Sequence, residues 1–499
     1  MMALGPYAKV KRFFAIRSDL SRSQAISKTR LRARVDAHAT IATVATVAGG
    51  VFVRSSPHAL SPITFAVAVA RSRIMQASTA TSRDIESPYA WARLCASLLL
   101  MTIGGSGIYT ISVVLPRIQA EFGVTRGDAS LPYTLSMIGF GFGGILMGRL
   151  ADRFGVMVPV MLGAVFLSAG FIAAGSAGNL FYFSLAQGVL IGLLGTSATF
   201  APLAADTSQW FTRRRGIAVA ICMSGNYIAG AVWAPVVQHF VDSAGWRQTY
   251  IGMGVFCLFT MLPLALVLRR RLPATAPLPV VTASTPARPF ELPPGSDPSR
   301  PLGFSPAVLQ GLLCVAGVAC CVAMSMPQVH IVAYCSDLGF GAARGAEMLA
   351  LMMGAGVISR LVSGWLSDHI GGLSTLMVGS ILQGIALLMF LFTDGVTSLY
   401  VVSAMFGLFQ GGIVPSYALI VRQFFAPREA GIRVGTVLMA SLLGMALGGW
   451  MSGAIFDLTG SYRAAFLNGT AWNLLNIGIV GFLIYRARRG HSLRLGQAS

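Results

Sequence analysis

The chain has 499 residues, of which 55% are hydrophobic and only 11% are charged. Its mean hydropathy of +0.70 is too high for a soluble globular protein and indicates a chain solvated by lipid. The net charge is +20, but residues 1–74 alone carry twelve basic and two acidic side chains. Cytoplasmic loops of membrane proteins are enriched in Lys and Arg, so the remaining positive charge does not imply a nucleic-acid partner.

Apolar stretches long enough to span a bilayer, about 20 residues each, recur along most of the chain. They predict an all-α integral membrane protein with twelve transmembrane helices in two six-helix halves. We expect the halves at residues 91–268 and 306–486, a Pro-rich cytoplasmic linker at 269–305 and a basic tail at 487–499. The expected spans are residues 94–115, 131–149, 156–177, 180–203, 217–238, 249–268, 307–329, 346–366, 373–392, 399–421, 434–455 and 465–485.

Basic residues are distributed unequally between alternate loops. One side carries seventeen arginines and the other carries five. By the positive-inside rule, both termini and the linker lie in the cytoplasm. We expect a multi-pass protein of the bacterial cytoplasmic (inner) membrane.

The first 90 residues are basic and contain one apolar run, residues 39–53, that is too short to span a bilayer comfortably. A transit peptide and a disordered basic arm both suit this composition. We favour a different interpretation, in which Met75 is the true start and the preceding residues are a translated upstream extension. N-terminal sequencing of the native protein tests it.

Chemical motifs of enzymes are not evident in the sequence. The seven cysteines lie in or beside apolar stretches without the spacing of metal or disulfide frameworks, so we interpret them as packing residues. The sequence has no nucleophile elbow, metal-ligand cluster or nucleotide-binding loop. We therefore expect no enzyme activity, no catalytic residue, no metal and no cofactor.

Three short segments recur at an offset close to 216 residues. FGVTRG at 122–127 recurs as FGAARG at 340–345, and GRLADRFG at 148–155 recurs as GWLSDHIG at 364–371. GWR at 245–247 has a looser counterpart in GSYR at 460–463. Repeats of this kind are typical of transporter folds, in which two parallel halves are related by an axis along the membrane normal.

The Gly-x-x-x-Asp-Arg-x-Gly loop between the second and third helices resembles the signature of the major facilitator superfamily, and the resemblance covers residues 90–490. It implies a loop that latches the two halves on the cytoplasmic side and acts as a gate. A weaker latch is expected here, because VMVP at 156–159 replaces the usual basic residues. A purely structural turn is the alternative. The expected gating residues are Gly148, Asp152, Arg153, Gly155, Gly364 and Asp368.

Four features resemble the monocarboxylate and oxalate/formate transporters: WFTRRRG at 210–216, GWR at 245–247, PQVHIVAY at 327–334, and Arg360 in the eighth helix. In that family an arginine in this helix binds the substrate carboxylate, and the resemblance gives this role to Arg360. Arg360 is expected about 12 Å from the cytoplasmic end of the helix, near the middle of the bilayer. A cation there is costly unless it faces a polar cavity. An arginine paired structurally with helix carbonyls or an acid is the alternative.

Two groups found in relatives are missing. The only lysines are Lys9, Lys11 and Lys28, so the spans have none of the lysines that many relatives use as a second anion partner. Gly356 stands where proton-coupled animal relatives carry an aspartate. A single fixed cation favours a monoanion over a dianion, and proton coupling lacks its usual carboxylate.

Other polar residues in apolar helices are candidates for the pocket, although most are expected to be interhelical hydrogen-bond partners. His330 could exchange a proton near neutral pH, but a position near the outer end of the seventh helix equally suits an interfacial histidine. With Arg360, the residues selected as substrate-binding are His330, Asn226, Tyr227 and Tyr417.

We predict a secondary active transporter of small organic anions, monocarboxylates in particular, that works by alternating access. A proton or a counter-anion is the expected coupled ion, and the protein is expected to be a monomer surrounded by membrane lipid. A drug or metabolite exporter driven by proton antiport is the main alternative. A non-transporting nutrient sensor is the second.

Overall fold

The computed structural model describes residues 85–270, 301–393 and 395–495. All of these residues belong to one compact unit, which begins at Ile74. The expectations for the N-terminal extension up to residue 84, for residues 271–300 of the linker and for residues 496–499 of the tail lie outside the described residues.

The described residues form helices and connecting turns. The first half contains α3 (Pro88–Gly104), α4 (Ser106–Phe122), α5 (Arg126–Phe154), α6 (Met157–Gly175), α7 (Leu180–Leu185), the π-helix η1 (Ala186–Gly195), the 3-10 helix η2 (Thr196–Thr199), α8 (Ala201–Trp210), α9 (Arg215–Ala244), α10 (Trp246–Leu266) and the 3-10 helix η3 (Val267–Arg269). The second half contains the 3-10 turn η4 (Pro301–Gly303), α11 (Pro306–Asp337), α12 (Ala342–Ile370), α13 (Gly372–Leu391), α14 (Val396–Gln410), α15 (Ile413–Phe424), α16 (Pro427–Thr459) and α17 (Tyr462–Leu495).

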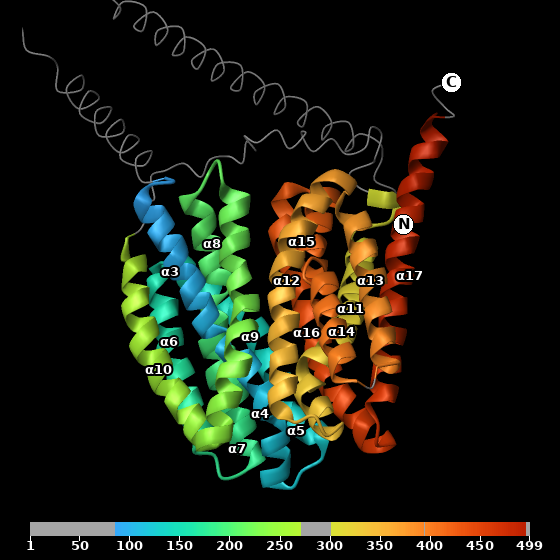
Figure 1. Ribbon diagram of the computed structural model, residues 1–499. Helices are drawn as coiled ribbons and strands as arrows, with labels where there is room; N and C mark the ends of the chain where they lie inside the picture. The colour runs from blue at the N-terminus through green and yellow to red at the C-terminus, as the bar shows by residue number, and fades with distance from the viewer. Residues whose placement is uncertain (1–84, 271–300, 394, 496–499) are drawn as a thin grey trace, which may run out of the picture. The chain divides into compact units, whose positions relative to one another are not determined.

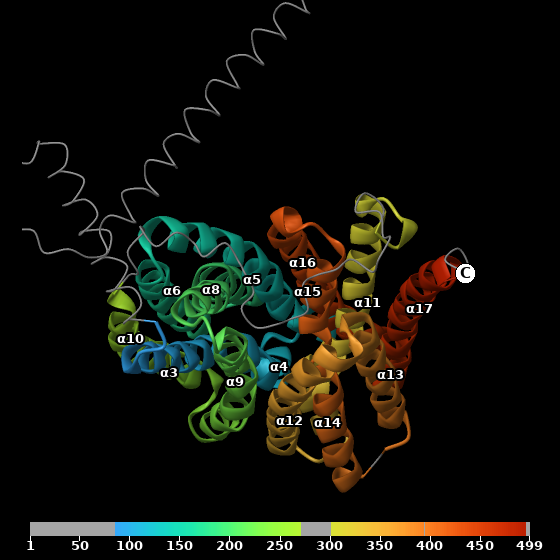
Figure 2. The same ribbon diagram turned by 90° about the horizontal axis from the view of Figure 1, so that it is seen from above.

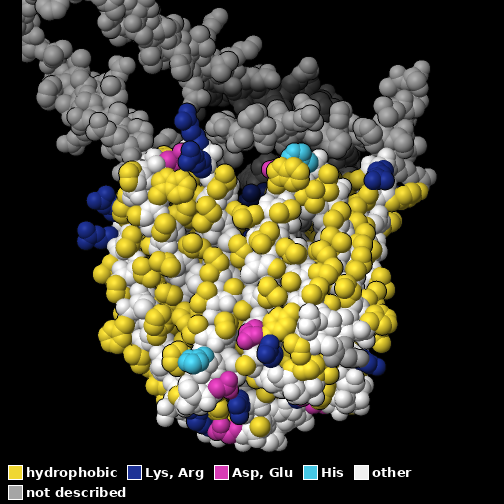
Figure 3. All heavy atoms as spheres, in the orientation of Figure 1, with side chains coloured by type: hydrophobic (Ala, Val, Ile, Leu, Met, Phe, Trp, Pro, Cys, Tyr) yellow, Lys and Arg dark blue, Asp and Glu magenta, His cyan; other side chains and the backbone are white. Residues whose placement is uncertain are grey.

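The prediction of twelve transmembrane helices is confirmed, because the described residues contain 12 helices long and apolar enough to cross a bilayer. These helices have 19 to 35 residues, and many are longer than the predicted apolar stretches because they continue into polar ends. Figure 3 shows apolar side chains over the middle of the visible face and charged side chains mainly toward its two ends. This pattern suits a surface surrounded by lipid.

Figures 1 and 2 show α3–α10 gathered in one group and α11–α17 in another. The two groups meet along three helix pairs, α5 with α16, α9 with α12 and α4 with α11. The expected two halves of six spans are thus visible in the packing, and Arg360 lies on α12, one of the helices of this interface.

Equivalent helices of the two halves end at glycines of the internal repeat. Gly155 follows α5 and Gly371 follows α12, with φ of 78° and 81° respectively. Gly245 and Gly460, after α9 and α16, also have positive φ, at 82° and 67°. Side chains with a Cβ rarely adopt these angles, so the recurrence of glycine at these sites reflects the turn geometry.

Three of the twelve spans are interrupted, at Gly105 between α3 and α4, across η1 and η2, and at Gly411–Gly412 between α14 and α15. The last break lies against α12, because a Cβ built at Gly411 would overlap the carbonyl oxygen of Gly356 and one at Gly412 would overlap Ser363. Only glycine allows the two helices to approach so closely. The break thus holds the middle of α12 tightly against its neighbour.

Glycines of α5 and α16 are tightly packed at one end of their contact and face open space at the other. Near the N-terminus of α5, a Cβ built at Gly127 would lie 3.1 Å from Asp457 and 3.3 Å from Ala454, and farther along one at Gly141 would lie 2.6 Å from Met439. Beyond that point, no atom in the described part of the chain comes within 4 Å of a Cβ built at any of four glycines. These are Gly144, Gly148, Gly431 and Gly435.

The α9–α12 contact shows the same divergence, since a Cβ at Gly356 would overlap Tyr227 whereas one at Gly364 or Gly216 meets no described atom within 4 Å. We call the end of the interface at Arg126 and Asp457 the closed end, and the end at Gly148 and Gly364 the open end. Because the repeat places both loops at one end, the two helix pairs separate in the same direction.

Candidate functional site

Arg360 is held by one face of α9. Its Nη1 donates a hydrogen bond to the carbonyl oxygen of Met223 at 2.9 Å. Its guanidinium carbon lies 4.6 Å from the centre of the Tyr227 ring, a distance suited to a cation–π contact. Met223 and Tyr227 are one helical turn apart, so together they fix the guanidinium against the interface between the halves.

The charge of Arg360 has no acidic partner within the described ranges. None of the five ion pairs there includes it. Its Nε is buried and has no hydrogen-bond partner among the described groups. A half-buried cation without a counter-charge is costly, and the unused edge of its planar fork matches the two oxygens of a carboxylate. The site can therefore bind a small carboxylate.

Two glycines make room for two tyrosines beside Arg360. A Cβ built at Gly356, one turn before Arg360 on α12, would lie 2.5 Å from two carbons of the Tyr227 ring. A Cβ at Gly230, on α9, would lie 2.9 Å from the Tyr109 ring of α4. Both tyrosines are 6% exposed and wall the site from the first half. The space that an aspartate at position 356 would need is thus occupied by Tyr227.

The structure brings together Arg360 and Tyr227 but places the other selected residues elsewhere. Asn226 points toward Gly105, since its Oδ1 lies 3.4 Å from a Cβ built there. The Tyr417 hydroxyl is fully buried in the second half and donates to Asn476 Oδ1 at 2.9 Å. Both make internal contacts on other helix faces.

His330 does not lie near the end of its helix, because α11 continues to Asp337. The side chain is 1% exposed, and both ring nitrogens are engaged. Nε2 lies 2.8 Å from the Gly449 carbonyl oxygen and Nδ1 lies 2.9 Å from the Tyr462 hydroxyl. Since the carbonyl only accepts, Nε2 carries the proton and Nδ1 accepts from Tyr462, which makes His330 a bridge between α11, α16 and α17.

The predicted gating loops are exposed in this conformation. Asp152, Arg153 and Asp368 are all exposed, and the Arg153 guanidinium lies 5.2 Å from the ring of its neighbour Phe154. Gly148 and Gly364 face open space, and Gly155 closes the turn after α5 through its positive φ. The loops are thus exposed at the end of the interface where the glycine surroundings are open.

The closed end contains a charge cluster that the sequence analysis does not identify. Arg126, at the start of α5, forms an ion pair with Asp337 of α11 and donates to the Tyr462 hydroxyl of α17 at 3.0 Å. The main-chain N–H groups of Arg126 and Gly127 donate to the two carboxylate oxygens of Asp457, at 2.8 and 2.6 Å. A carboxylate of α16 therefore caps the N-terminus of α5 across the interface.

The signal for this cluster was present in the FGVTRG repeat, which singles out Arg126 and Arg344. The repeat alone does not show that only the first arginine reaches the other half. Its partners come from three helices of the second half, and hydropathy carries no information about which loop residues meet there.

No group of three or more His, Cys, Asp and Glu side chains in the described ranges is arranged to hold a metal ion. The candidate site is therefore Arg360, a cation without an acidic partner among the described residues, at the interface of the two helical halves. This interface is closed at one end and separated at the other. Together with twelve spans, these features define a multi-pass membrane transporter.

Comparisons with known proteins agree. Residues 97–396 and 348–499 match the profile of the Major Facilitator Superfamily, and the chain belongs to that family, which is a family of transporters and not of enzymes. Monocarboxylate transporter 13 of Rattus norvegicus is 27% identical over 349 residues, which are 68% of this chain and 76% of that protein. The uncharacterized MFS-type transporter YcxA of Bacillus subtilis is 27% identical over 363 residues, 70% of this chain and 84% of that protein.

Among solved structures, the chain resembles a bacterial homologue of the human lysosomal transporter Spinster in an inward-facing, occupied conformation. The TM-score is 0.58 and the identity 18%, with 81% of this chain and 98% of that chain covered. At this identity the likeness shows the fold, which is the predicted all-α fold with twelve membrane helices.

Proposed function

We propose that the protein transports small organic anions, monocarboxylates in particular, and that Arg360 binds the substrate carboxylate. The observation that carries the proposal is the guanidinium at the α9–α12 interface, with one nitrogen on the Met223 carbonyl and a buried Nε that has no partner among the described residues. Similarity to proteins named monocarboxylate transporters supports the same substrate class.

The surroundings of Arg360 favour anion exchange over proton symport. A carboxylate at position 356 would be a natural proton carrier, but the ring of Tyr227 occupies that space. Since no acid among the described residues pairs with this cation, the site is neutral overall when a monoanion is bound and charged when it is empty. An empty site is therefore the harder one to enclose between the halves, which couples the departure of one anion to the arrival of another.

Alternating access requires that the closed end open as the open end closes. The open end carries the basic loops, which the positive-inside rule assigns to the cytoplasm. This conformation is then inward-facing, and both termini lie in the cytoplasm. A bacterial inner membrane fits this orientation. The exposed loops at Gly148 and Gly364 would then meet when the inner side closes, which is the gating role expected of them.

The test is uptake of labelled lactate, pyruvate and formate into proteoliposomes, with and without a pH gradient and with and without trans-loaded anion. Two charge-assisted hydrogen bonds to Arg360 contribute about 2–3 kcal/mol in total after discounting for partial exposure, so Arg360→Ala should raise KM about 30- to 150-fold. Arg117→Ala is the matched control, because Arg117 pairs with Asp242 at the surface and its side chain is 58% exposed.

Normal anion uptake by Arg360→Ala would reject the anchor role. Stimulation by trans-loaded anion and not by a pH gradient supports exchange, and the reverse result supports symport. Transport of bulky apolar compounds that is indifferent to Arg360→Ala would instead favour the exporter.

A further inference from the structure

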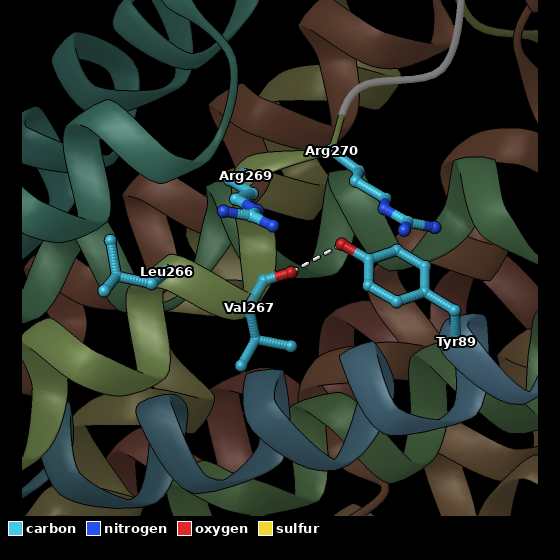
Figure 4. Close-up of a pocket in the computed structure, with 5 residues that line it drawn as sticks. All are labelled: Tyr89, Leu266, Val267, Arg269 and Arg270. Carbon is cyan, nitrogen blue, oxygen red and sulfur yellow. Dashed lines mark hydrogen bonds between the residues drawn. The ribbon is translucent and has the colours of Figure 1, made fainter.

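A crevice of about 350 Å³ lies where α10 ends against α3, at the end of the first half that carries its basic loops. It is lined by Tyr89, Leu266, Val267, Arg269 and Arg270. Figure 4 shows the guanidinium of Arg269 above the end of α10 and that of Arg270 over the Tyr89 ring, while the side chains of Leu266 and Val267 point away from both guanidinium groups. Two cations and two apolar residues thus line the crevice.

The two arginines are not required to cap the helix. Two carbonyls at this helix end already have partners on α3, because Tyr89 Oη donates to the Val267 oxygen at 2.5 Å and Arg93 Nη1 donates to the Arg270 oxygen at 3.1 Å. Carbonyls at a helix end commonly attract basic side chains, but here α3 supplies the donors. The guanidinium groups of Arg269 and Arg270 are left for another ligand.

The nearby acid is also occupied. Asp206 accepts two hydrogen bonds from Arg93, at 2.7 and 2.8 Å, in a bidentate pair that is almost fully buried. Arg269 and Arg270 are both exposed, and neither takes part in an ion pair within the described ranges. Among the described groups, the partner of the Arg270 charge is the Tyr89 ring, 4.8 Å away. Two adjacent cations thus have no counter-ion among the described residues.

The apolar side of the crevice continues along the lipid-facing surface of α10. Leu266 is 53% exposed and Phe259, two turns earlier, is 73% exposed. A soluble anion would gain nothing from these side chains. A lipid would place its headgroup at the arginines and its acyl chain along the helix, which is how basic crevices at the ends of membrane helices recognise anionic lipids.

We propose that this crevice binds the phosphate headgroup of an anionic phospholipid through Arg269 and Arg270, with Leu266 against the first part of an acyl chain. Tyr89 holds the Arg270 guanidinium by stacking and the end of α10 by its hydroxyl, so an occupied site would fasten α10 to α3. The proposal is independent of the substrate and of the role of Arg360.

The test uses the full chain in detergent and measures lipid retention by native mass spectrometry, with added dioleoylphosphatidylglycerol or dioleoylphosphatidylcholine. The wild type should retain phosphatidylglycerol preferentially, and Arg269→Gln/Arg270→Gln should bind it about 30-fold more weakly, at about fivefold for each basic side chain. Arg213→Gln/Arg214→Gln is the matched control, since it removes two neighbouring exposed arginines from the same end of the first half but not from the crevice.

An equal loss in the control variant would mean general surface charge and would overturn the site. So would competition by inorganic phosphate as strong as that by phosphatidylglycerol, because the ligand would then be a soluble anion. Leu266→Gln separates the two chemistries, since it should weaken the lipid and leave phosphate unaffected. Arg269→Lys/Arg270→Lys keeps the charge and should retain most of the lipid binding. If this double variant folds but no longer binds the lipid, the site requires the geometry of the guanidinium groups.

Discussion

Replacing Arg126 by Gln should release the closed end. The Arg126 side chain reaches three groups of the second half, namely Asp337, Tyr462 and the ring of Phe456, whose centre is 4.3 Å from the guanidinium carbon. A glutamine can keep at most one of these contacts. The main-chain bonds to Asp457 do not depend on the side chain and should persist.

The size of the effect follows from the exposure of the partners. The Arg126 side chain is 9% exposed but that of Asp337 is 33% exposed, so the pair contributes less than the 3–5 kcal/mol typical of a fully buried one. With the Tyr462 hydrogen bond and the cation–π contact, the contribution across the interface is about 2–4 kcal/mol. The ratio of molecules with this end closed to molecules with it open should fall about 30- to 700-fold.

The assay uses a reporter inside the closed contact. Ser130 is fully buried on α5, and its Oγ lies 2.9 Å from a Cβ built at Gly453 of α16. Ser130→Cys, in a background without the exposed Cys95, should react slowly with a membrane-impermeant maleimide and much faster when Arg126→Gln is added. Arg344→Gln is the control, because Arg344 is the repeat counterpart of Arg126 but is exposed.

Unchanged labelling of the reporter in Arg126→Gln would refute the reasoning, because it would show that the cluster does not hold the halves together. Equal acceleration by Arg344→Gln would refute it differently, by assigning the effect to surface charge. The melting temperature of each variant separates local opening from loss of fold, since opening of one end should change it little.

Three further outcomes are expected. Gly356→Ala should push the Tyr227 ring off Arg360, raise the substrate KM about 5- to 30-fold and lower stability by about 1–3 kcal/mol, which uptake and thermal melting check together. Gly364→Ala should leave the melting temperature of this conformation unchanged, since its Cβ meets no described atom, but slow transport if the loops pack when the open end closes. Glu86→Gln should speed hydrogen exchange at the Arg214 amide. The Arg214 amide donates to the Glu86 carboxylate and so lowers the Glu86 pKa. The bond is therefore present at neutral pH. It is lost as the pH falls from the ordinary glutamate pKa through the lower pKa of the folded state.

The architecture could be predicted because hydropathy and the internal repeat report directly on it. Each span needs a run of apolar residues, and the glycines at Gly155 and Gly371 recur because both turns need positive φ. Arg360 could be selected for the same kind of reason, since a cation in an apolar helix stands out.

The rest of the site could not be predicted, because polarity in a span does not tell which side of the helix a residue occupies. Asn226 and Tyr227 are neighbours on α9, yet one faces Gly105 and the other faces Arg360. His330 was selected for its titration, but the buried contacts with Gly449 and Tyr462 depend on how three helices pack. Such contacts between distant segments leave no periodic trace in the sequence.

The two halves share a repeat, but its equivalent residues make different contacts in each half. Arg126 joins the halves at the α5–α16 side, whereas its counterpart Arg344 is exposed. Asp457 caps α5 across the interface, whereas its counterpart Asp242 pairs with Arg117 within the first half. Arg360, the proposed substrate anchor, lies at the other contact, between α9 and α12.

This division lets the substrate and the closed end act on one another. A ligand shifts a conformational equilibrium only by the difference in its affinity for the two states. The cluster at Arg126 holds the closed end by about 2–4 kcal/mol, and under the proposed function a carboxylate on Arg360 supplies about 2–3 kcal/mol through its charge-assisted hydrogen bonds. A bound anion offsets the closed cluster only to the extent that its bonds to Arg360 are stronger in the opposite conformation. Weakening the cluster by Arg126→Gln should therefore let the empty protein change conformation, and exchange should become partly uncoupled.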